Sequence, residues 1–265
     1  CALPISVPAA RAQFTPRPLA DPATGERYHV EGAFGIWSPT ADMTISSESL
    51  GIIGSTIDLR KDLGLLDQKF KQLQLVVRPS KRNKLRLERI PIQFTQEAIL
   101  TRDIVFQGQR YKVGLPVNSQ LDWKAYRFGY EFDFVSRDRG FAGFILEAKY
   151  TDVLAKLQSP VNNEFVHAKA PIPAVGGIGR AYVAPNISIT GELTLFKVPD
   201  SVSEDYKGRF VDVNAYGTIN FTNAIGAQVG YRSFDVGYTV RKNGVTTDSG
   251  AFTLKGLYFG AVARF

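Results

Sequence analysis

The chain has 265 residues, a formal net charge of +7 and one cysteine, Cys1, so neither an intrachain disulfide nor a thiolate metal cluster can form. Apolar residues make up 44% of the chain, which favours a packed fold over disorder, but no apolar run reaches the roughly 18 residues of a membrane-spanning helix. Two histidines and no strong basic block argue against a metal cluster and a nucleic-acid site, so we expect no metal, no cofactor and no nucleic-acid partner.

The first residues have the features of a cleaved secretory signal. Ala10-Arg11-Ala12 before Gln13 fits the small-x-small rule of a signal-peptidase site. We therefore interpret residues 1–12 as a signal-peptide remnant, with a lipid-modified Cys1 as the alternative. Residues 13–26 contain three prolines and are expected to form an extended tail.

From Tyr28 onward, apolar and polar residues alternate with a period of two, which is typical of strands with two different faces. The predicted strands are Tyr28–Trp37, Phe70–Arg78, Lys84–Phe106, Tyr111–Val135, Ala142–Tyr150, Ile172–Val183, Ile187–Leu195, Val211–Phe221, Ile225–Tyr231 and Gly250–Phe265. Short turns are predicted at 79–83, 136–140, 185–186 and 222–224, and longer loops at 38–68, 157–170, 199–208 and 241–249. The densest basic block, Lys81, Arg82 and Lys84, is interpreted as part of a solvated turn.

The third predicted strand contains an irregularity. Its apolar residues begin at Leu85 and Leu87 and continue at Ile90 and Ile92, on the opposite parity. Such a change of parity within one strand predicts a β-bulge near Arg89 or Pro91.

The fourth predicted strand has an aromatic face opposite a charged face. Tyr126, Phe128, Tyr130, Phe132 and Phe134 alternate with Arg127, Gly129, Glu131 and Asp133. Both faces are satisfied if lipid lies outside the sheet and a polar interior lies inside.

The alternation of short turns with longer loops predicts one architecture for residues 27–265. The fold class is all-β, a transmembrane antiparallel up-and-down β-barrel of about ten strands, with eight or twelve as alternatives. A barrel is needed because a sheet in lipid cannot leave its edges unpaired. A soluble β-sandwich that ends on Phe265 is the competing interpretation.

The segments YRFGYEFDF and LYFGAVARF, with their aromatic residues and the C-terminal Phe265, resemble the outer-membrane β-barrel proteins of Gram-negative bacteria, near the small OmpW and OmpX types. The resemblance implies an outer-membrane location, a monomer in contact with outer-membrane lipid and lipopolysaccharide, and a periplasmic tail. It also implies that the barrel-assembly machinery recognises Phe265 as the assembly signal.

The inward parity collects charges of both signs. The predicted lumen-lining residues are Arg86, Glu88, Arg127, Glu131, Asp133, Glu147, Lys149, Arg180, Glu192, Asp212, Arg232 and Arg264. Two readings remain open for them. They can interlock as a salt-bridged plug of a structural barrel, or they can line a narrow, porin-like path for small solutes.

Two other functions are weighed against these, and the sequence leaves enzymatic activity open. A rim hydrolase, of the protease or lipid A deacylase type, would use His167 with Asp200, Glu204 or Asp205, but no catalytic arrangement is recognisable. A surface-binding or adhesin barrel would act through loops 38–68 and 157–170. The glycines at 176, 177 and 179 are predicted to allow close strand packing rather than phosphate binding.

Overall fold

The computed structural model describes residues 23–47, 54–199, 203, 205–242 and 245–265. Regular structure within these residues is all β. The strands are β1 (Val30–Ser47), β2 (Ile57–Asp58), β3 (Phe70–Val77), β4 (Asn83–Ile99), β5 (Ile104–Phe106), β6 (Gln109–Tyr111), β7 (Pro116–Arg137), β8 (Gly140–Gln158), β9 (Asn163–Ala184), β10 (Ile187–Lys197), β11 (Tyr206–Asn220), β12 (Ile225–Lys242) and β13 (Val245–Arg264). A helix long and apolar enough to cross a membrane is absent from the part of the chain described above.

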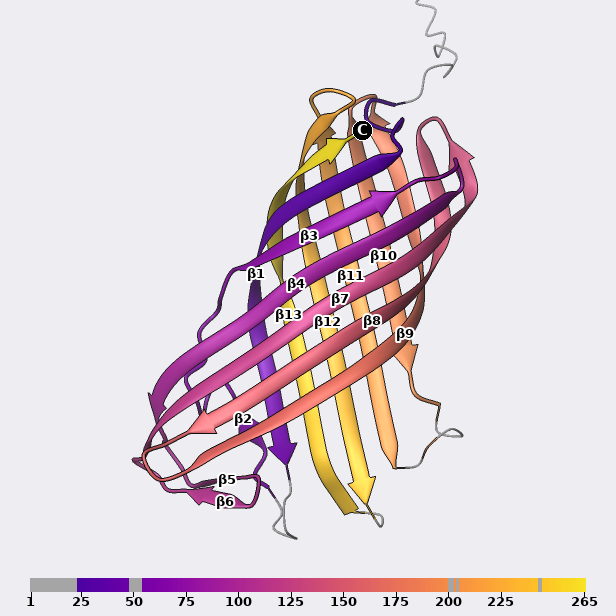
Figure 1. Ribbon diagram of the computed structural model, residues 1–265. Helices are drawn as coiled ribbons and strands as arrows, with labels where there is room; N and C mark the ends of the chain where they lie inside the picture. Colours follow the sequence, from indigo (N-terminus) through magenta and orange to yellow (C-terminus); the bar gives the residue numbers. More distant parts are fainter. Residues whose placement is uncertain (1–22, 48–53, 200–202, 204, 243–244) are drawn as a thin grey trace, which may run out of the picture.

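The strands close into a barrel. The order along the sheet is β13-β12-β11-β10-β9-β8-β7-β4-β3-β1, and β13 pairs with β1 to complete the ring (Figure 1). All these pairings are antiparallel; β2 adds two residues to β1, while β5 and β6 form a separate hairpin. The described chain therefore confirms the predicted up-and-down barrel of ten strands.

The two ends of the barrel differ. One end, here called the terminal end, carries the C-terminus, the start of β1 and the short turns that precede β4, β8, β10 and β12. The turn before β8 depends on glycine: Gly140 has φ +156°, and a side chain there would collide with the Arg180 carbonyl. The opposite end, here called the loop end, carries the β5–β6 hairpin and the connections of β1 to β3 and β10 to β11.

The four predicted loops were wrong in extent, because each contains strand residues, and the largest differences are at 38–68 and 157–170. β1 continues through Ser38 to Ser47, and β8 and β9 extend to Gln158 and from Asn163. In the added part of β1 the buried side chains are Pro39, Ala41 and Met43, and the exposed ones, Ser38, Thr40 and Asp42, are polar. The small and apolar residues of this segment face the interior and its polar residues face outward, as in a strand exposed to water. The polar residues led to its interpretation as a loop. Residues 48–53 of the predicted 38–68 loop lie outside the described residues.

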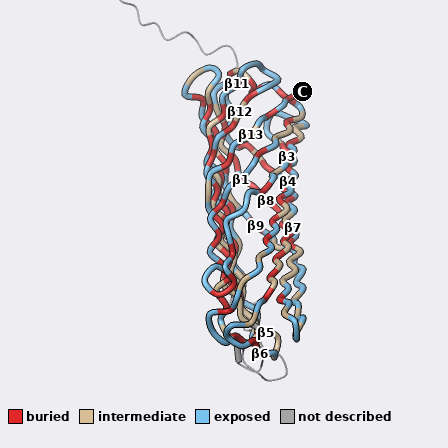
Figure 2. The backbone as a smooth tube through the Cα atoms, turned by 90° about the vertical axis from the view of Figure 1, so that its left-hand side faces the viewer, coloured by how far each residue is buried: buried red, intermediate tan, exposed pale blue. Residues whose placement is uncertain are grey.

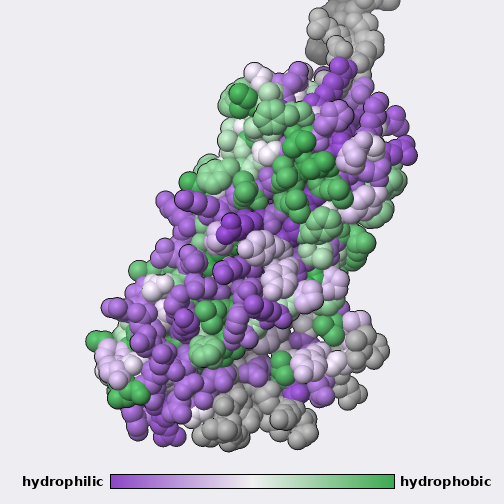
Figure 3. All heavy atoms as spheres, viewed as in Figure 1, coloured by the Kyte–Doolittle hydropathy of each residue, from purple (hydrophilic) through white to green (hydrophobic). Residues whose placement is uncertain are grey.

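The polarity of the strand faces inverts halfway along the barrel. On β7 the outward side chains are, from the loop end, Asn118, Gln120, Asp122, Lys124, Tyr126, Phe128, Tyr130, Phe132 and Phe134. The inward ones, in the same direction, are Val117, Ser119, Leu121, Trp123, Ala125, Arg127, Gly129, Glu131 and Asp133. The terminal half thus has an apolar outside and a charged inside, and the loop half has the reverse. Figure 3 shows the same division on one face, with hydrophobic residues gathered towards the terminal end.

This inversion explains why the predicted bulge near Arg89 or Pro91 was wrong. β4 pairs with β7 from Asn83 to Ile99 without a register shift. Lys84, Arg86, Glu88, Ile90 and Ile92 all point inward on one parity. The side-chain parity is constant, and what changes at Arg89 is the medium outside the strand, from lipid to water.

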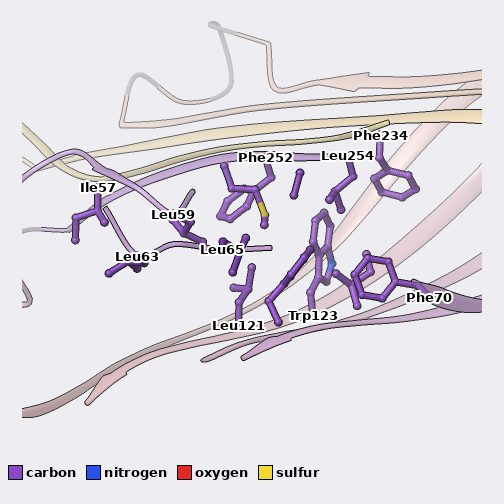
Figure 4. Packing of buried hydrophobic residues seen from close by; sticks show 14 of the residues in the cluster. Ile57, Leu59, Leu63, Leu65, Phe70, Leu121, Trp123, Phe234, Phe252 and Leu254 are labelled. Carbon is purple, nitrogen blue, oxygen red and sulfur yellow. The ribbon is translucent and has the colours of Figure 1, made fainter. Parts of the chain in front are cut away.

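The inside of the loop half is a hydrophobic core. β3 pairs with β4 only over residues 73–77 of β3, and β9 pairs with β10 only over residues 175–184 of β9, so the strands form two walls beyond these ladders (Figure 2). Trp123 and Leu121 from one wall face Phe234 and Phe252 from the other (Figure 4), and the Trp123 and Phe234 rings lie 5.8 Å apart. Ile57, Leu59, Leu63 and Leu65, which belong to β2 and the segment after it, fill the space between the walls.

The outward belt of the terminal half gives a direct test of membrane contact. Leu146 lies in the middle of the apolar face of β8 and is 55% exposed. We expect Leu146→Arg to lower the free energy of unfolding in lipid vesicles by about 2–4 kcal/mol, because a charge would enter the hydrocarbon. Thr95→Arg, on the exposed outer face of β4 in the loop half, serves as the control and should cost less than about 0.5 kcal/mol. Equal losses in vesicles would contradict the placement of the belt.

The segment after β2 is held by an ion pair that predicts a pH dependence. Arg102 donates two hydrogen bonds to Asp62, of 2.8 and 2.6 Å, and these bonds lower the pKa of the Asp62 carboxyl below its usual range. A lowered folded-state pKa stabilises the segment above about pH 4 and the contribution is lost as the pH falls further. Hydrogen exchange of residues 57–66, corrected for intrinsic rates, should therefore speed up between pH 7 and pH 3. Asp62→Asn should abolish most of this difference, whereas Asp67→Asn, in an exposed pair with Arg60, should preserve it.

Candidate functional site

The twelve predicted lumen-lining residues all lie inside the terminal half of the barrel. They project from the inward parity of β4, β7 to β13, and eleven of them are buried, with the Glu88 side chain 9% exposed. Alternation brings them together because each strand contributes every second residue to the same enclosed space. What they can do depends on how they pair.

The first part of the network joins β4, β7 and β10. The Lys84 ammonium lies 2.6 Å from Glu131 and 2.9 Å from Asp133, and Arg86 lies 2.6 Å from the other Glu131 oxygen. Arg86 also reaches across the interior to Glu192, at 2.8 Å. Opposite walls of the barrel are thereby connected through charged hydrogen bonds.

Arg127 is the centre of the network. Its guanidinium donates to Glu147 on β8 and to Glu192 on β10, and a third nitrogen lies 3.4 Å from Glu88 on β4. One planar cation thus holds carboxylates from three other strands, a geometry that the five fixed donors of arginine permit and lysine does not.

The third part of the network lies next to the hydrophobic core. Arg232 binds Asp212 through two parallel hydrogen bonds, of 3.0 and 2.8 Å, and also donates to Glu88. Lys149 bonds Asp212 at 2.8 Å and lies 4.0 Å from the centre of the Phe210 ring. The charges therefore continue up to the first aromatic layer of the core.

The segment before β1 closes the terminal mouth of the barrel. The backbone of Ala23 and Thr24 bonds the turns before β8 and β10, and Asn220 donates to the Thr24 carbonyl at 2.7 Å. Glu26 is buried and pairs with Arg78 at 3.2 Å. Residues 23–26 fall within the predicted tail, whose other residues, 13–22, lie outside the described chain together with 1–12.

Further polar contacts fix this closure from within. The Glu26 carboxylate accepts a hydrogen bond from Tyr182 at 3.1 Å, and Arg180 lies 3.6 Å from it. Arg264 donates to both Glu31 and Asn220. The interior charges balance in number within the described residues. The cations are Lys84, Arg86, Arg127, Lys149, Arg232, Arg180, Arg264 and Arg78, and the carboxylates are Glu131, Asp133, Glu192, Glu147, Glu88, Asp212, Glu26 and Glu31.

Four of these charges were missed by the sequence interpretation. Lys84 was assigned to a solvated turn but is 1% exposed, so that part of the prediction was wrong. Its parity matches Arg86, and this was the available signal. Glu31 begins β1 on the inward parity, but Glu26 and Arg78 lie outside regular strands, so alternation carries no information about them.

Two small hollows lie inside the barrel. A hollow of about 20 Å³ lies beside Glu88, Arg127 and Arg232, and a second of about 20 Å³ lies in the hydrophobic core near Leu121. Each is enough for about one water molecule.

Within the described residues, His167 is paired with Asp152, which is not one of the acidic residues considered for hydrolysis. His167 bonds Asp152 through Nε2 at 2.7 Å on the outer wall of β8 and β9, and Lys169 shares the same carboxylate at 3.5 Å. Asp200 and Glu204 lie outside the described residues, and His29 is exposed at the terminal mouth.

The close strand packing predicted for the glycines of β9 is confirmed at Gly176, where a side chain would collide with the Leu193 carbonyl of β10.

The central position of Arg127 leads to a prediction of stability. We expect Arg127→Gln to lower the free energy of unfolding by about 3–5 kcal/mol, because it removes a cation that three buried carboxylates share and leaves negative charge in excess inside the barrel. The control is Arg209→Gln, whose ion pair with Asp235 is largely exposed and should cost at most about 1 kcal/mol. Denaturant titration in detergent measures both, and similar small losses would show that the interior is hydrated rather than interlocked.

Comparison with known proteins adds to this geometry. The chain matches no family model and no curated protein sequence. Among solved structures it is similar to the outer-membrane protease OmpT of Escherichia coli, with a TM-score of 0.60 and 7% identity over 89% of this chain and 96% of that one. Ail, the attachment invasion locus protein of Yersinia pestis, gives a TM-score of 0.34 with 9% identity, over 88% of this chain and 99% of that one. The outer-membrane protein AlkL gives a TM-score of 0.37 with 8% identity, over 99% of this chain and 98% of that one.

At such low identity, the likeness to OmpT speaks for the fold alone, and the two lower scores add no argument. The structure contributes the closed ring of ten strands, the apolar outward belt and the charged interior. These features together place the chain in the outer membrane. The protein is a small outer-membrane β-barrel.

Proposed function

We propose that this protein is a closed barrel that does not conduct solutes and that acts through the part of it beyond the membrane. The observation that carries the proposal is the double closure of the interior. The terminal half is filled by paired charges, and the loop half by a hydrophobic core that includes Leu59, Leu63 and Leu65. Of the two readings of the lumen, this arrangement supports the plug.

The energetics of the interior favour permanent closure. A path for ions would require water beside charged groups. The charges here bind one another directly, and the hollow beside Glu88, Arg127 and Arg232 has room for about one water molecule. Opening a path through the barrel would separate Arg127 from Glu147 and Glu192, and breaking buried ion pairs of this kind costs several kcal/mol of free energy. The hydrophobic layer next to Phe210 would oppose the passage of ions as well.

The loop half offers the surface on which the protein would act. Its strands turn polar side chains outward, and large apolar side chains are exposed near the loops, among them Ile99, Val113, Val161 and Phe165, which are 67%, 59%, 74% and 62% exposed. Exposed apolar groups at loop tips are typical of binding surfaces. This supports the surface-binding reading, with the monomer as the expected form.

Conductance across a planar bilayer tests the closure. We expect no steps from the purified protein, and also none from Lys156→Gln, an exposed change on the outer wall. Reproducible steps whose ion selectivity changes in Glu131→Gln would overturn the proposal, since Glu131 lies inside the barrel.

A rim hydrolase is the second candidate. It is favoured by the likeness in fold to the protease OmpT and by the His167–Asp152 pair on the outer wall. Cleavage of a peptide library or of lipid A by the purified protein, with loss of cleavage in His167→Ala, would support this candidate. Cleavage that persists in His167→Ala would point to other residues, and no cleavage would leave the binding function.

The role of Phe265 as an assembly signal leads to a prediction in cells. Its side chain is 81% exposed, while its backbone bonds His29 and Val30, so the ring contributes little to packing. We expect deletion of Phe265 to reduce the amount inserted in the outer membrane several-fold, while refolding of the purified chain in detergent changes little. The control is Phe259→Ala, an exposed residue of the same strand face, which should insert normally. Equal losses in both assays would make Phe265 a packing residue.

A further inference from the structure

In the loop half, the wall formed by β4, β7, β8 and β9 ends on an open strand edge. β9 pairs with β8 from residue 163 to residue 181, but its pairing with β10 ends at Val175 and Leu195. Residues 163–174, here called the β9 edge, therefore have a strand neighbour on one side only (Figure 1). Within the described chain, no backbone hydrogen bond joins the β9 edge to a strand other than β8.

Two hydrogen bonds show which residues of β9 direct their backbone groups towards β8. In an antiparallel sheet, the N–H and C=O groups of successive residues point alternately to the two neighbouring strands. The Ala170 carbonyl accepts a hydrogen bond from the Thr151 hydroxyl of β8 at 3.2 Å. The Tyr182 N–H donates to the carbonyl of Arg139, just before β8, at 3.0 Å. The even-numbered residues of β9 are thus the ones bonded to β8.

The odd-numbered residues of the β9 edge consequently face the open side. Two of them are Pro171 and Pro173, which lack an N–H and are tolerated in a sheet where no ladder bond is lost. The other odd-numbered residues include Phe165, His167 and Lys169, whose N–H and C=O groups form a row along the edge. A row of this kind is a template for an added strand.

The inner side of the β9 edge is apolar and incompletely covered. Ala168 and Ala170 have the same inward parity as Ala174, which is 1% exposed, but both of them are exposed. Val166 and Ile172, on the same parity, pack against the hydrophobic core and are only partly buried. A strand added here with apolar residues at alternate positions would cover these side chains and extend the core.

The chain closes the corresponding edge on the other side of the barrel in this way. β1 loses β3 as a neighbour beyond Trp37, and β2 pairs with β1 at residues 44 and 45. The Leu59 N–H donates to the Met43 carbonyl at 3.0 Å, and the Leu59 side chain lies in the hydrophobic core. An extended segment that turns apolar side chains inward is therefore what this fold uses to cover an open edge.

The described ends of the connection between β10 and β11 lead away from the β9 edge. The Val198 N–H donates to the Gly208 carbonyl at 2.8 Å, and the Arg241 N–H donates to the Asp205 carbonyl at 2.7 Å. Both ends are thus bound to the other wall, at β11 and β12. The described residues leave the β9 edge to another polypeptide.

A second copy of this chain in the same membrane does not fit the β9 edge. Two such copies are related by a symmetry axis along the membrane normal. This axis makes their β9 strands antiparallel only if the strands lie in the membrane plane. β9 instead runs obliquely across the barrel (Figure 1), as tilted barrel strands do.

We propose that the β9 edge adds a strand from another protein. The added segment is extended, has apolar residues at alternate positions, pairs with residues 163–169 and turns its apolar side towards the core. The proposal rests on the surface-binding part of the proposed function and names the chemistry of its partner. Steps in the bilayer experiment together with normal strand addition would overturn the closed barrel alone. A silent bilayer without strand addition would overturn the β9 edge alone.

Hydrogen exchange of single amides, measured by NMR on the full chain in detergent, tests the edge itself. We expect the amides of Phe165, His167 and Lys169 to exchange about tenfold or more faster than those of Val166 and Ala168, since only the latter are bonded to β8. The rates are corrected for intrinsic exchange. Residues 153–156 of β8 have strands on both sides, so as the control they should show no alternation. Equal protection at all five amides would overturn the proposal, because the row would not be the open edge of a folded strand.

A synthetic peptide tests strand addition. The probe is a short fluorescent peptide in which valine alternates with threonine, and its fluorescence anisotropy reports binding to the protein in detergent. We expect Lys169→Pro to weaken binding about fivefold or more, because it removes an N–H of the edge. The matched control, Lys169→Ala, loses the same side chain and its ion pair with Asp152 but keeps the N–H, and should change binding less than about twofold. Unchanged heat-modifiable gel mobility checks that both variants are folded.

Two altered peptides require no change in the protein. Methylation of every backbone nitrogen keeps the apolar side chains but removes the donors, so binding should be lost. A peptide of the same composition with its valines grouped together should bind more weakly, because it has no apolar side. Equal binding of the methylated peptide, equal binding to Lys169→Pro and Lys169→Ala, or no binding of the alternating peptide would each overturn the proposal. A dimer in native mass spectrometry that Lys169→Pro abolishes would identify a second copy as the occupant and overturn the assignment to another protein.

Discussion

The charges that the strands place inside this barrel are held by partners from other parts of the chain, and most of these partners lie on another strand. Arg127 illustrates the constraint, since its guanidinium binds carboxylates from β4, β8 and β10. A buried charge without a partner costs several kcal/mol, so each ion pair also fixes which strands face each other across the interior. The backbone hydrogen bonds between neighbouring strands close the ring, and the ion pairs hold strands together across its interior. The closure of the lumen and the order of the terminal mouth both follow from this pairing.

A second constraint is the change of medium along each strand. In lipid the outward face must be apolar, and the inward face is free to be polar; in water the relation reverses. The chain meets both demands on one unbroken strand. On β4 the same alternate positions point inward throughout, but the inward residues change from charged at Arg86 to apolar at Ile92. The barrel therefore behaves as a membrane protein at one end and as a water-exposed sandwich at the other, with the basic residues at the boundary.

The boundary gives the molecule its depth in the membrane. Tyr126 and Tyr150 end the apolar belt on β7 and β8, and Lys124 and Lys169 follow towards the loop end. Aromatic rings and long cations prefer the two sides of this interface. The charges inside the barrel pair with one another, whereas the cations at this boundary lie on the outer face, where their long side chains can reach the headgroup region.

Alternation, a local property of the sequence, was enough to predict an all-β barrel of about ten strands with a charged inward face. It failed where its meaning depends on the surroundings: residues 38–47 have the alternation of a strand, but only the structure shows that Ala41 and Met43 lie inside and that the polar side chains between them lie outside. The partners of Arg127 and the position of Glu26 in the mouth were decided by the tertiary structure alone. Each joins residues far apart in the chain, and such contacts depend on the shear and closure of the ring, which no local pattern encodes.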